Sequence, residues 1–415
     1  MPNTPRLGLF EGVGIELEYM IVDADRLTVQ PLTDRVLAAE AGRTVTDVEF
    51  DDVSWSNEMV LHVIELKTTG PVTELYGLAA RFGEHVARVN AHLRTHGARL
   101  MPTAMHPWMD PCAETCLWPH AYSRVYRTLD RIFDCRAHGW ANLQSVHINL
   151  PFADDGQFAR LHAAVRLLLP ILPALAAASP VLEGRPNGTL DNRLSVYRTN
   201  CARIPSLTGR VVPEPVFTRA DYKREILQRL YRDLEPYDPG RVLRHEWVNA
   251  RGAIARFSRN TIEIRLLDMQ ECPAADLAIA AVVVEVLKLL VGETWSDLRA
   301  QQAWSVEALA DILEAVIVDA DAATITDGDY LTTLGYPGPV PCSAVQLWRH
   351  FVDTVFGSNP SALAFCQREL ATLLERGPLA RRMLSALGPN PPRDRIADLY
   401  RTLCDRLDAG VMFEG

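Results

Sequence analysis

The sequence has little of what would mark a nucleic-acid-binding or a membrane protein. It carries 42 basic against 52 acidic side chains, a formal net charge of -10, whereas nucleic-acid-binding proteins usually show a basic surface. Its longest apolar stretch, residues 163–178, is interrupted by Arg166, Pro170 and Pro173, and a membrane-spanning helix needs about 20 apolar residues. We therefore expect neither a nucleic-acid partner nor a membrane segment.

Paired cysteines and an export signal are also missing. None of the eight cysteines forms a CxxC pair, so their spacing indicates neither a zinc ribbon nor a disulfide framework. Residues 1–10 contain no apolar signal core. We expect reduced, scattered thiols in a cytoplasmic protein.

The sequence also lacks a glycine-rich loop that could cradle a phosphate group. Gly12 and Gly14 precede a predicted strand instead of opening a helix, so they fit neither the P-loop nor the dinucleotide-binding fingerprint. A nucleotide would have to be bound through metal ions and arginines.

What is present is a set of strand patterns that lie far apart in the chain. Strands are predicted at about 13–22, 59–67, 145–150 and 261–267, with helices between them. This order favours an α+β fold with a largely antiparallel sheet backed by helices. From about Pro273 onward we expect almost only helix. Helical patterns cover 72–96, 117–137, 156–178, 218–236, 273–298, 305–320, 343–356, 360–376 and 391–408.

Three of the predicted strands carry a polar pair on one face, because residues i and i+2 of a strand point the same way. A half-solvated sheet would also alternate polar and apolar residues. Adjacent carboxylates repel each other, however, and glutamate is a weak strand former. A Mg²⁺ ion would offset the repulsion, and one imidazole among the ligands also suits Mn²⁺. The pairs are Glu16 and Glu18, His147 and Asn149, and Glu263 and Arg265.

The remaining strand adds Glu58 and Glu65. Their spacing of seven would place them on opposite faces of a regular strand. Either Glu58 lies before the strand proper, or a bulge intervenes. Glu65 has the apolar neighbours Leu61 and Val63 on its face, and a half-buried carboxylate needs a partner. A metal ion would serve, and a surface or rim salt bridge is the alternative for both glutamates.

In this order, the segments resemble the glutamate–cysteine ligase type 2 family, also called carboxylate–amine ligases. The resemblance covers roughly residues 10–281, and the C-terminal helices carry no matching motif. It rests on 12–18, on Glu58 and Glu65, and on 103–107, 144–149, 178–180, 195–198, 247–251 and 261–265 with Asp268.

The resemblance implies a curved antiparallel sheet with an acidic metal-binding face, similar to the catalytic fold of glutamine synthetase. ATP would phosphorylate a carboxylate, by default the γ-carboxylate of glutamate. An amine, by default that of cysteine, would then attack the acyl phosphate. We expect this catalytic domain at 1–298 and a helical C-terminal region at 299–415 packed on it.

The resemblance also assigns roles to single residues. It implies metal-ligand roles for Glu16, Glu18, Glu58, Glu65, His147 and Glu263. It implies catalytic roles for Arg265, Glu65 and Glu263, and ATP contacts for Arg265, Arg251 and Asn149. Substrate contacts are expected from Arg198, Arg251 and Tyr197, with surface ion pairs as the alternative for the two arginines.

Other readings stay open. The same chemistry could act on a peptide or a specialised biosynthetic amine, since the helices after Pro273 could dock a partner. The chain could also be a non-catalytic, ATP-binding regulatory protein. We expect Trp247 to pack in the core and His106 to be a structural turn residue. The sequence identifies no general base. It also leaves the oligomeric state open, and a homo-oligomer is one of the alternatives.

Overall fold

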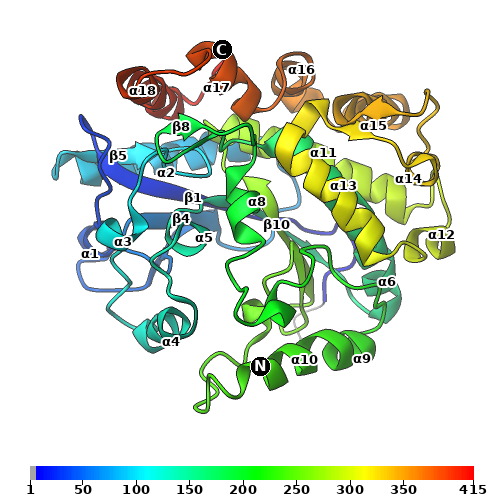
Figure 1. Cartoon of the computed structure of the whole chain (residues 1–415), viewed down its shortest axis with the longest axis horizontal. Coiled ribbons are helices and arrows are strands. Elements are labelled where there is room, and N and C mark those ends of the chain that lie inside the picture. Colours follow the sequence, from blue (N-terminus) through cyan, green and yellow to red (C-terminus); the bar gives the residue numbers. More distant parts are fainter. Residues whose placement is uncertain (1–5) are drawn as a thin grey trace.

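The computed structural model describes residues 6–415, and an eight-stranded antiparallel sheet lies at its centre (Figure 1). The strands follow the order β2-β3-β4-β1-β6-β10-β9, and β5 pairs with the second half of β1. Their bounds are β1 (Gly14–Asp23), β2 (Asp47–Glu49), β3 (Val53–Asn57), β4 (Val63–Thr68), β5 (Ala98–Met101), β6 (Ser145–Pro151), β9 (Ala253–Arg256) and β10 (Thr261–Asp268).

The four predicted strands are all present, as β1, β4, β6 and β10. β4 begins only at Val63, because the chain turns between Glu58 and Val63 to form the hairpin with β3. This places Glu58 before the strand proper, which was one of the two predicted alternatives. The short strands β2, β3, β5 and β9 were not predicted; they complete the sheet on both sides of β1 and β6.

One face of the sheet is apolar and buried. In β1, Ile15, Leu17 and Tyr19 have no exposed surface, and full burial of a large aliphatic side chain stabilises a protein by about 1.5–3 kcal/mol. The helix α2 (Leu78–Arg94) packs on β5, and α6 (Asp155–Leu168) packs on β10. This layer leaves the polar face of the same strands free for a site.

The helix α11 (Pro273–Val291) packs against both α2 and α6. It is apolar on nearly every side, as expected of a helix buried between layers, and α15 (Ala344–Ser358) and α16 (Gln367–Arg376) cover it from outside. A single hydrophobic cluster therefore includes residues from both ends of the chain, from Val13 to Phe413. The predicted boundary between 298 and 299 stays a prediction.

The C-terminal part is mainly helical, as predicted, and α15 to α18 lie along one side of the molecule, opposite α9 and α10 (Figure 1). No helix in the described part of the chain combines the length and the apolar character that a bilayer span requires. The further elements there are α12 (Leu298–Gln302), α13 (Val306–Asp319), α14 (Gly328–Thr333), α17 (Leu379–Leu387), α18 (Arg393–Ala409), β11 (Thr324–Ile325) and β12 (Cys342–Ser343).

Two predicted helices are shorter in the structure for local reasons, and some short helices were not predicted at all. The predicted helix 117–137 begins only at Ser123, because Tyr122 has the positive φ of 69°. The predicted helix 156–178 breaks after Leu168, where Pro170 and Pro173 cannot continue its hydrogen bonds. The predicted helix 218–236 is present as α9 (Arg219–Tyr222) and α10 (Gln228–Leu234), joined by a π-helical turn at Lys223–Leu227. The other helices are α1 (Thr33–Ala41), α3 (Pro111–Glu114), α4 (Ser123–Phe133), α5 (His138–Ala141), α7 (Pro173–Ala176) and α8 (Asn192–Tyr197).

Candidate functional site

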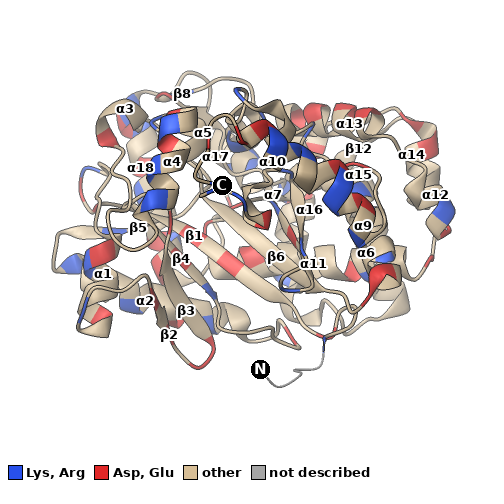
Figure 2. Cartoon of the chain, turned by 90° about the horizontal axis from the view of Figure 1, so that it is seen from below, with Lys and Arg blue, Asp and Glu red and all other residues tan. Residues whose placement is uncertain are grey.

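The strand register brings the predicted polar pairs together on one face of the sheet. In β1, Glu16 lies opposite Lys67 of β4 on one side and opposite His147 of β6 on the other. Glu18 lies opposite Glu65. Figure 2 shows red segments, which mark Asp and Glu, on the strands in the middle of the sheet. The polar faces of separate strands thus form one continuous surface.

This surface is one wall of a cavity of about 830 Å³. The lining that does not come from the sheet is largely aromatic and apolar. This aromatic wall includes Tyr122 directly before α4, Tyr126 of α4, Trp140 of α5, and Trp247. Within residues 6–415, the residues that line the cavity all lie between Glu16 and Arg265. On the sheet side they include Glu16, Glu18, Ser56, Glu58, Glu65, Lys67, Ser145, His147, Arg256, Glu263 and Arg265.

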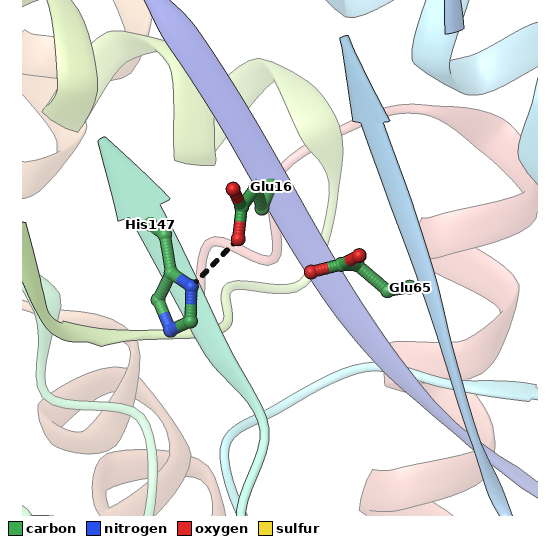
Figure 3. Close-up of side chains that lie close together, drawn as sticks. All are labelled: Glu16, Glu65 and His147. Atoms are coloured by element: carbon green, nitrogen blue, oxygen red, sulfur yellow. Dashed lines mark hydrogen bonds and ion pairs between the residues drawn. The ribbon is translucent and has the colours of Figure 1, made fainter. Parts of the chain in front are cut away.

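Glu16, Glu65 and His147 form the centre of the acidic wall (Figure 3). Each offers one ligand atom, and these atoms lie within 4.8 Å of one another. Two carboxylate oxygens and one imidazole nitrogen are suitable donors for Mg²⁺ or Mn²⁺. The residues present therefore fit a divalent metal ion.

Hydrogen bonds fix His147 and Glu16. The His147 Nδ1 lies 2.9 Å from Glu16 Oε2, and its Nε2 lies 2.9 Å from Ser145 Oγ. Asn149 donates to the other Glu16 oxygen at 2.9 Å. Burial favours the neutral forms, but the bond between them holds the pKa of Glu16 below and that of His147 above their ordinary values. Both side chains are thereby oriented toward the cavity.

Glu18 forms a second layer behind His147. It accepts hydrogen bonds from the backbone N–H and the hydroxyl of Ser145, at 2.7 and 3.0 Å, and its side chain is 11% exposed. Its other oxygen lies 3.7 Å from His147 Nε2. Glu18 can therefore orient the imidazole or bind a metal ion directly.

Glu65 and Lys67 form an ion pair on the next strand. The Lys67 Nζ lies 2.5 Å from Glu65 Oε2, and Ser56 Oγ donates to the same oxygen at 2.5 Å. Burial and the negative charge of Glu16 outweigh Lys67 and raise the pKa of Glu65 to about 7. Lys67 was not predicted as a site residue, although it lies two positions after Glu65 and the alternation rule places it on the same face.

Glu58 lies at the edge of the cavity, in the turn that follows β3. Burial raises its pKa well above the ordinary value, and the charges of Glu65 and Glu18 add to the effect. Tyr126 of the aromatic wall accepts a hydrogen bond from the neighbouring Asn57 at 3.1 Å. Glu58 is thus a carboxyl group that faces other carboxylates without an ion pair of its own among residues 6–415.

Glu263 and Arg265 lie on β10, at the other end of the wall. Arg265 donates to Glu263, and Arg256 of β9 donates to the same carboxylate at 2.6 Å. Burial would raise the pKa of Glu263, but the charge of Arg265 lowers it. Arg256 was missed because β9 is short, yet it lies seven positions before Glu263 across the β9–β10 hairpin.

A β-bulge places Arg265 in the cavity wall. The pairing of β10 with β6 shifts between Ile264 and Leu267, so that Arg265 and Leu266 together oppose His147. A bulge of this kind re-aims one side chain of a strand. Arg193 of α8 donates to the Arg265 carbonyl at 2.8 Å and thereby supports the bulge.

Three predicted contacts are not among the residues that line the cavity. Asn149 instead supports Glu16 through a hydrogen bond. Arg251 is 1% exposed, and its guanidinium donates to Glu214 at 2.5 Å and to backbone carbonyls of the neighbouring loop. Arg198 forms an ion pair with Glu314 at 3.3 Å. Arg198 follows the surface ion-pair alternative, whereas the ion pair of Arg251 is buried. Neither arginine is among the lining residues, whereas Tyr197 is. Trp247 packs against the hydrophobic core, as predicted, and also lines the cavity.

Comparison with known proteins agrees with this geometry. The family model described as glutamate–cysteine ligase family 2 matches residues 12–317. An uncharacterised protein of Archaeoglobus fulgidus is 35% identical over 276 residues, which cover 66% of this chain and 74% of that protein. A protein of Rubrobacter xylanophilus, provisionally named glutamate–cysteine ligase 2-3, is 26% identical over 275 residues, 65% of this chain and 67% of its own.

A solved structure also shares the fold. The glutamate–cysteine ligase of Francisella tularensis in complex with AMP superposes with a TM-score of 0.57 at 12% identity, covering 97% of this chain and 90% of the other. This confirms the predicted fold class, an antiparallel sheet with an acidic face and helices behind it.

Proposed function

The chain belongs to glutamate–cysteine ligase family 2 and is a ligase that forms C–N bonds, and on this premise we propose an ATP-dependent carboxylate–amine ligase. By default, the carboxylate is the γ-carboxylate of glutamate and the amine is that of cysteine. The products would be an amide, ADP and phosphate.

The observation that carries the proposal is the acidic wall with its arginines. Phosphoryl transfer is mainly a matter of positioning and charge neutralisation. Mg²⁺, with Mn²⁺ as the alternative, would bind to Glu16, Glu65 and His147 and screen the charge on the ATP phosphates. Glu18, Glu58 and Glu263 are the further candidate ligands on the same wall.

The chain's own cations complete the site. Arg265 presents a planar guanidinium beside Glu263, and such a group can bind two phosphate or carboxylate oxygens at once. Ser145 and Asn149 hold His147 and Glu16 in place, so that the ligand atoms need little rearrangement when charge develops on the transferred group.

The aromatic wall favours a second candidate for the amine. Tyr122, Tyr126, Trp140 and Trp247 offer far more apolar contact than the side chain of cysteine needs. An amine with a larger side chain, or a peptide, would fill this wall. The C-terminal helices, which first motivated a larger acceptor, contribute no lining residue.

We also place the enzyme in the cytoplasm, since all eight cysteines are free thiols.

The proposal is tested with the intact, Mg²⁺-loaded protein. ATP, glutamate and a mixed pool of amino acids and peptides are supplied, and the products are identified by mass spectrometry while ADP release is followed. We expect one γ-glutamyl amide and stoichiometric ADP and phosphate. The variant Glu263→Gln, verified as folded by circular dichroism, should give none. ATP binding without turnover for any amine would instead favour a regulatory protein.

A further inference from the structure

Lys67 is a cation on the acidic wall that can move. Its side chain is 35% exposed toward the cavity, whereas the side chain of its partner Glu65 is 6% exposed. A lysine is a point charge on a flexible four-carbon stem, and its donors rotate freely. The ammonium group therefore has room to leave Glu65, while the carboxylate is held within the sheet.

Glu65 does not depend on Lys67 for its position. Ser56, which lies directly opposite on β3, donates its hydroxyl to Glu65 Oε2 at 2.5 Å. Lys67 Nζ donates to the same hydroxyl at 2.8 Å. If the ammonium group moves away, the Ser56 bond still holds the carboxylate oxygen in the same place.

Lys67 and a divalent cation would compete for Glu65. The ligand atoms of Glu16, Glu65 and His147 lie within 4.8 Å of one another, and Lys67 Nζ lies 2.5 Å from Glu65. A cation held by these ligands would be only a few ångströms from the ammonium group. At that distance two positive charges repel strongly in a partly buried site.

We propose that Lys67 is a displaceable counter-ion of Glu65. Its ammonium group neutralises Glu65 until a divalent cation binds there, and it then turns into the cavity to bind an anionic oxygen of the substrate. That oxygen belongs to the transferring phosphoryl group or to the carboxylate that receives it. The second half of the proposal rests on the proposed function; the competition for Glu65 does not.

The variant Lys67→Met separates the two halves, because the predicted effects have opposite signs. Calorimetric titration with MnCl₂ alone should show binding about tenfold tighter than in the wild type, since a competing charge is gone. At saturating Mn²⁺, the non-hydrolysable ATP analogue AMP-PNP should bind about tenfold more weakly, since one cation for its phosphate is lost. A merely structural role of Lys67 would weaken both.

The two sources of the anionic oxygen are told apart by a third measurement. If AMP-PNP binding is unchanged and the KM for the carboxylate substrate rises instead, Lys67 binds the carboxylate. Equal Mn²⁺ affinity in Lys67→Met and the wild type would overturn the proposal, and so would unchanged binding of both anions. The metal and AMP-PNP measurements need no turnover, so they stand even if no amine is ligated.

A remote lysine serves as the matched control. Lys288 of α11 forms an ion pair with Glu285 at 2.6 Å, outside the cavity. Lys288→Met removes the same charge and should leave Mn²⁺ and AMP-PNP binding unchanged. Should Lys67→Met fail to fold, Lys67→Gln keeps a polar group and should give the same pair of opposite shifts.

Discussion

Two ion pairs with the same separation of 2.5 Å have different surroundings. Arg382 of α17 pairs with Glu271 in the loop after β10, and the two side chains are 1% and 0% exposed. Arg382 also donates to backbone carbonyls, and Glu271 accepts from the backbone of Phe413. The Lys67–Glu65 pair instead borders a cavity. A pair closed by backbone groups holds segments together, whereas a pair open to a cavity can exchange partners.

Two histidines repeat this contrast. His106 Nε2 donates to the Leu27 carbonyl at 2.6 Å, and Nδ1 accepts from the backbone of Trp108 at 3.2 Å. Both nitrogens are satisfied in the neutral form, and burial lowers the pKa to about 4. The pKa of His147, between Glu16 and Ser145, is raised. Burial by itself lowers the pKa of both imidazoles, so the groups around each histidine decide whether its pKa ends below or above the ordinary value.

The largest expected effect is on catalysis. Glu16→Gln keeps the side-chain size but removes a charge from the centre of the open cluster, so we expect kcat to fall about a thousandfold, as when preorganised charge is lost from an active site. ADP release measures the rate. The exposed Glu307→Gln on α13 should have no effect. If Glu16→Gln keeps a tenth of the activity or more, the acidic wall is not the site of chemistry.

The next effect is on stability. Arg382→Met leaves Glu271 buried without a cation, so the free energy of unfolding should fall by about 3–5 kcal/mol. Urea denaturation measures it, and kcat per folded molecule should stay unchanged. Arg376→Met removes a far more exposed pair with Glu414 and should cost under about 1 kcal/mol. If both variants lost the same free energy of unfolding, an ion pair enclosed by backbone groups would be no more important for stability than an exposed one.

The third effect depends on pH. The unfolded chain binds a proton at His106 near pH 6.5, whereas the folded chain does so only near pH 4. His106 therefore destabilises the fold as pH falls from about 6.5 toward 4, by up to about 1.4 kcal/mol per pH unit. His106→Gln lacks this loss, so its stability should approach or exceed that of the wild type at low pH. Urea denaturation at pH 7, 6 and 5 measures it, and parallel pH profiles would contradict it.

The smallest effect should come from Lys67→Met on stability in EDTA. Glu65 keeps its bond from Ser56. Its pKa is about 7 with Lys67 in place, and removal of Lys67 raises that pKa further, so the carboxylate can take up a proton. We therefore expect a change under about 1 kcal/mol, as for partly exposed pairs. If the free energy of unfolding fell as much as in Arg382→Met, the Lys67–Glu65 pair would hold the fold together in the same way as the Arg382–Glu271 pair.

The alternation of side chains on strands explains what the sequence could predict. Glu16, His147, Glu263 and Arg265 were assigned to one face because each lies in a strand with aliphatic residues opposite, and all four line the cavity. The same rule applied to 65–67 would have added Lys67. What no local pattern contains is the register between strands, which sets Glu16 opposite both Lys67 and His147.

The arginines outside strands could not be predicted in this way. Arg251 lies in a loop, and Arg198 follows α8, so no periodicity fixes the direction of either side chain. Their partners Glu214 and Glu314 are far enough away in the chain that only the tertiary structure joins them to these arginines. Motif resemblance placed both residues near substrate, and the fold turned them toward other acids.

The position of α11 has a consequence for how this chain can diversify. The helices that cover α11 contribute nothing to the cavity lining, so their surface sequence can drift without touching the chemistry. Yet most of α11 is buried, apart from the end around Lys288, and α15 and α16 are its outer cover. The C-terminal region is therefore free to change in sequence but not to be lost. A chimera that exchanges it between relatives should fold only where the residues that meet α11 are exchanged as a matching set.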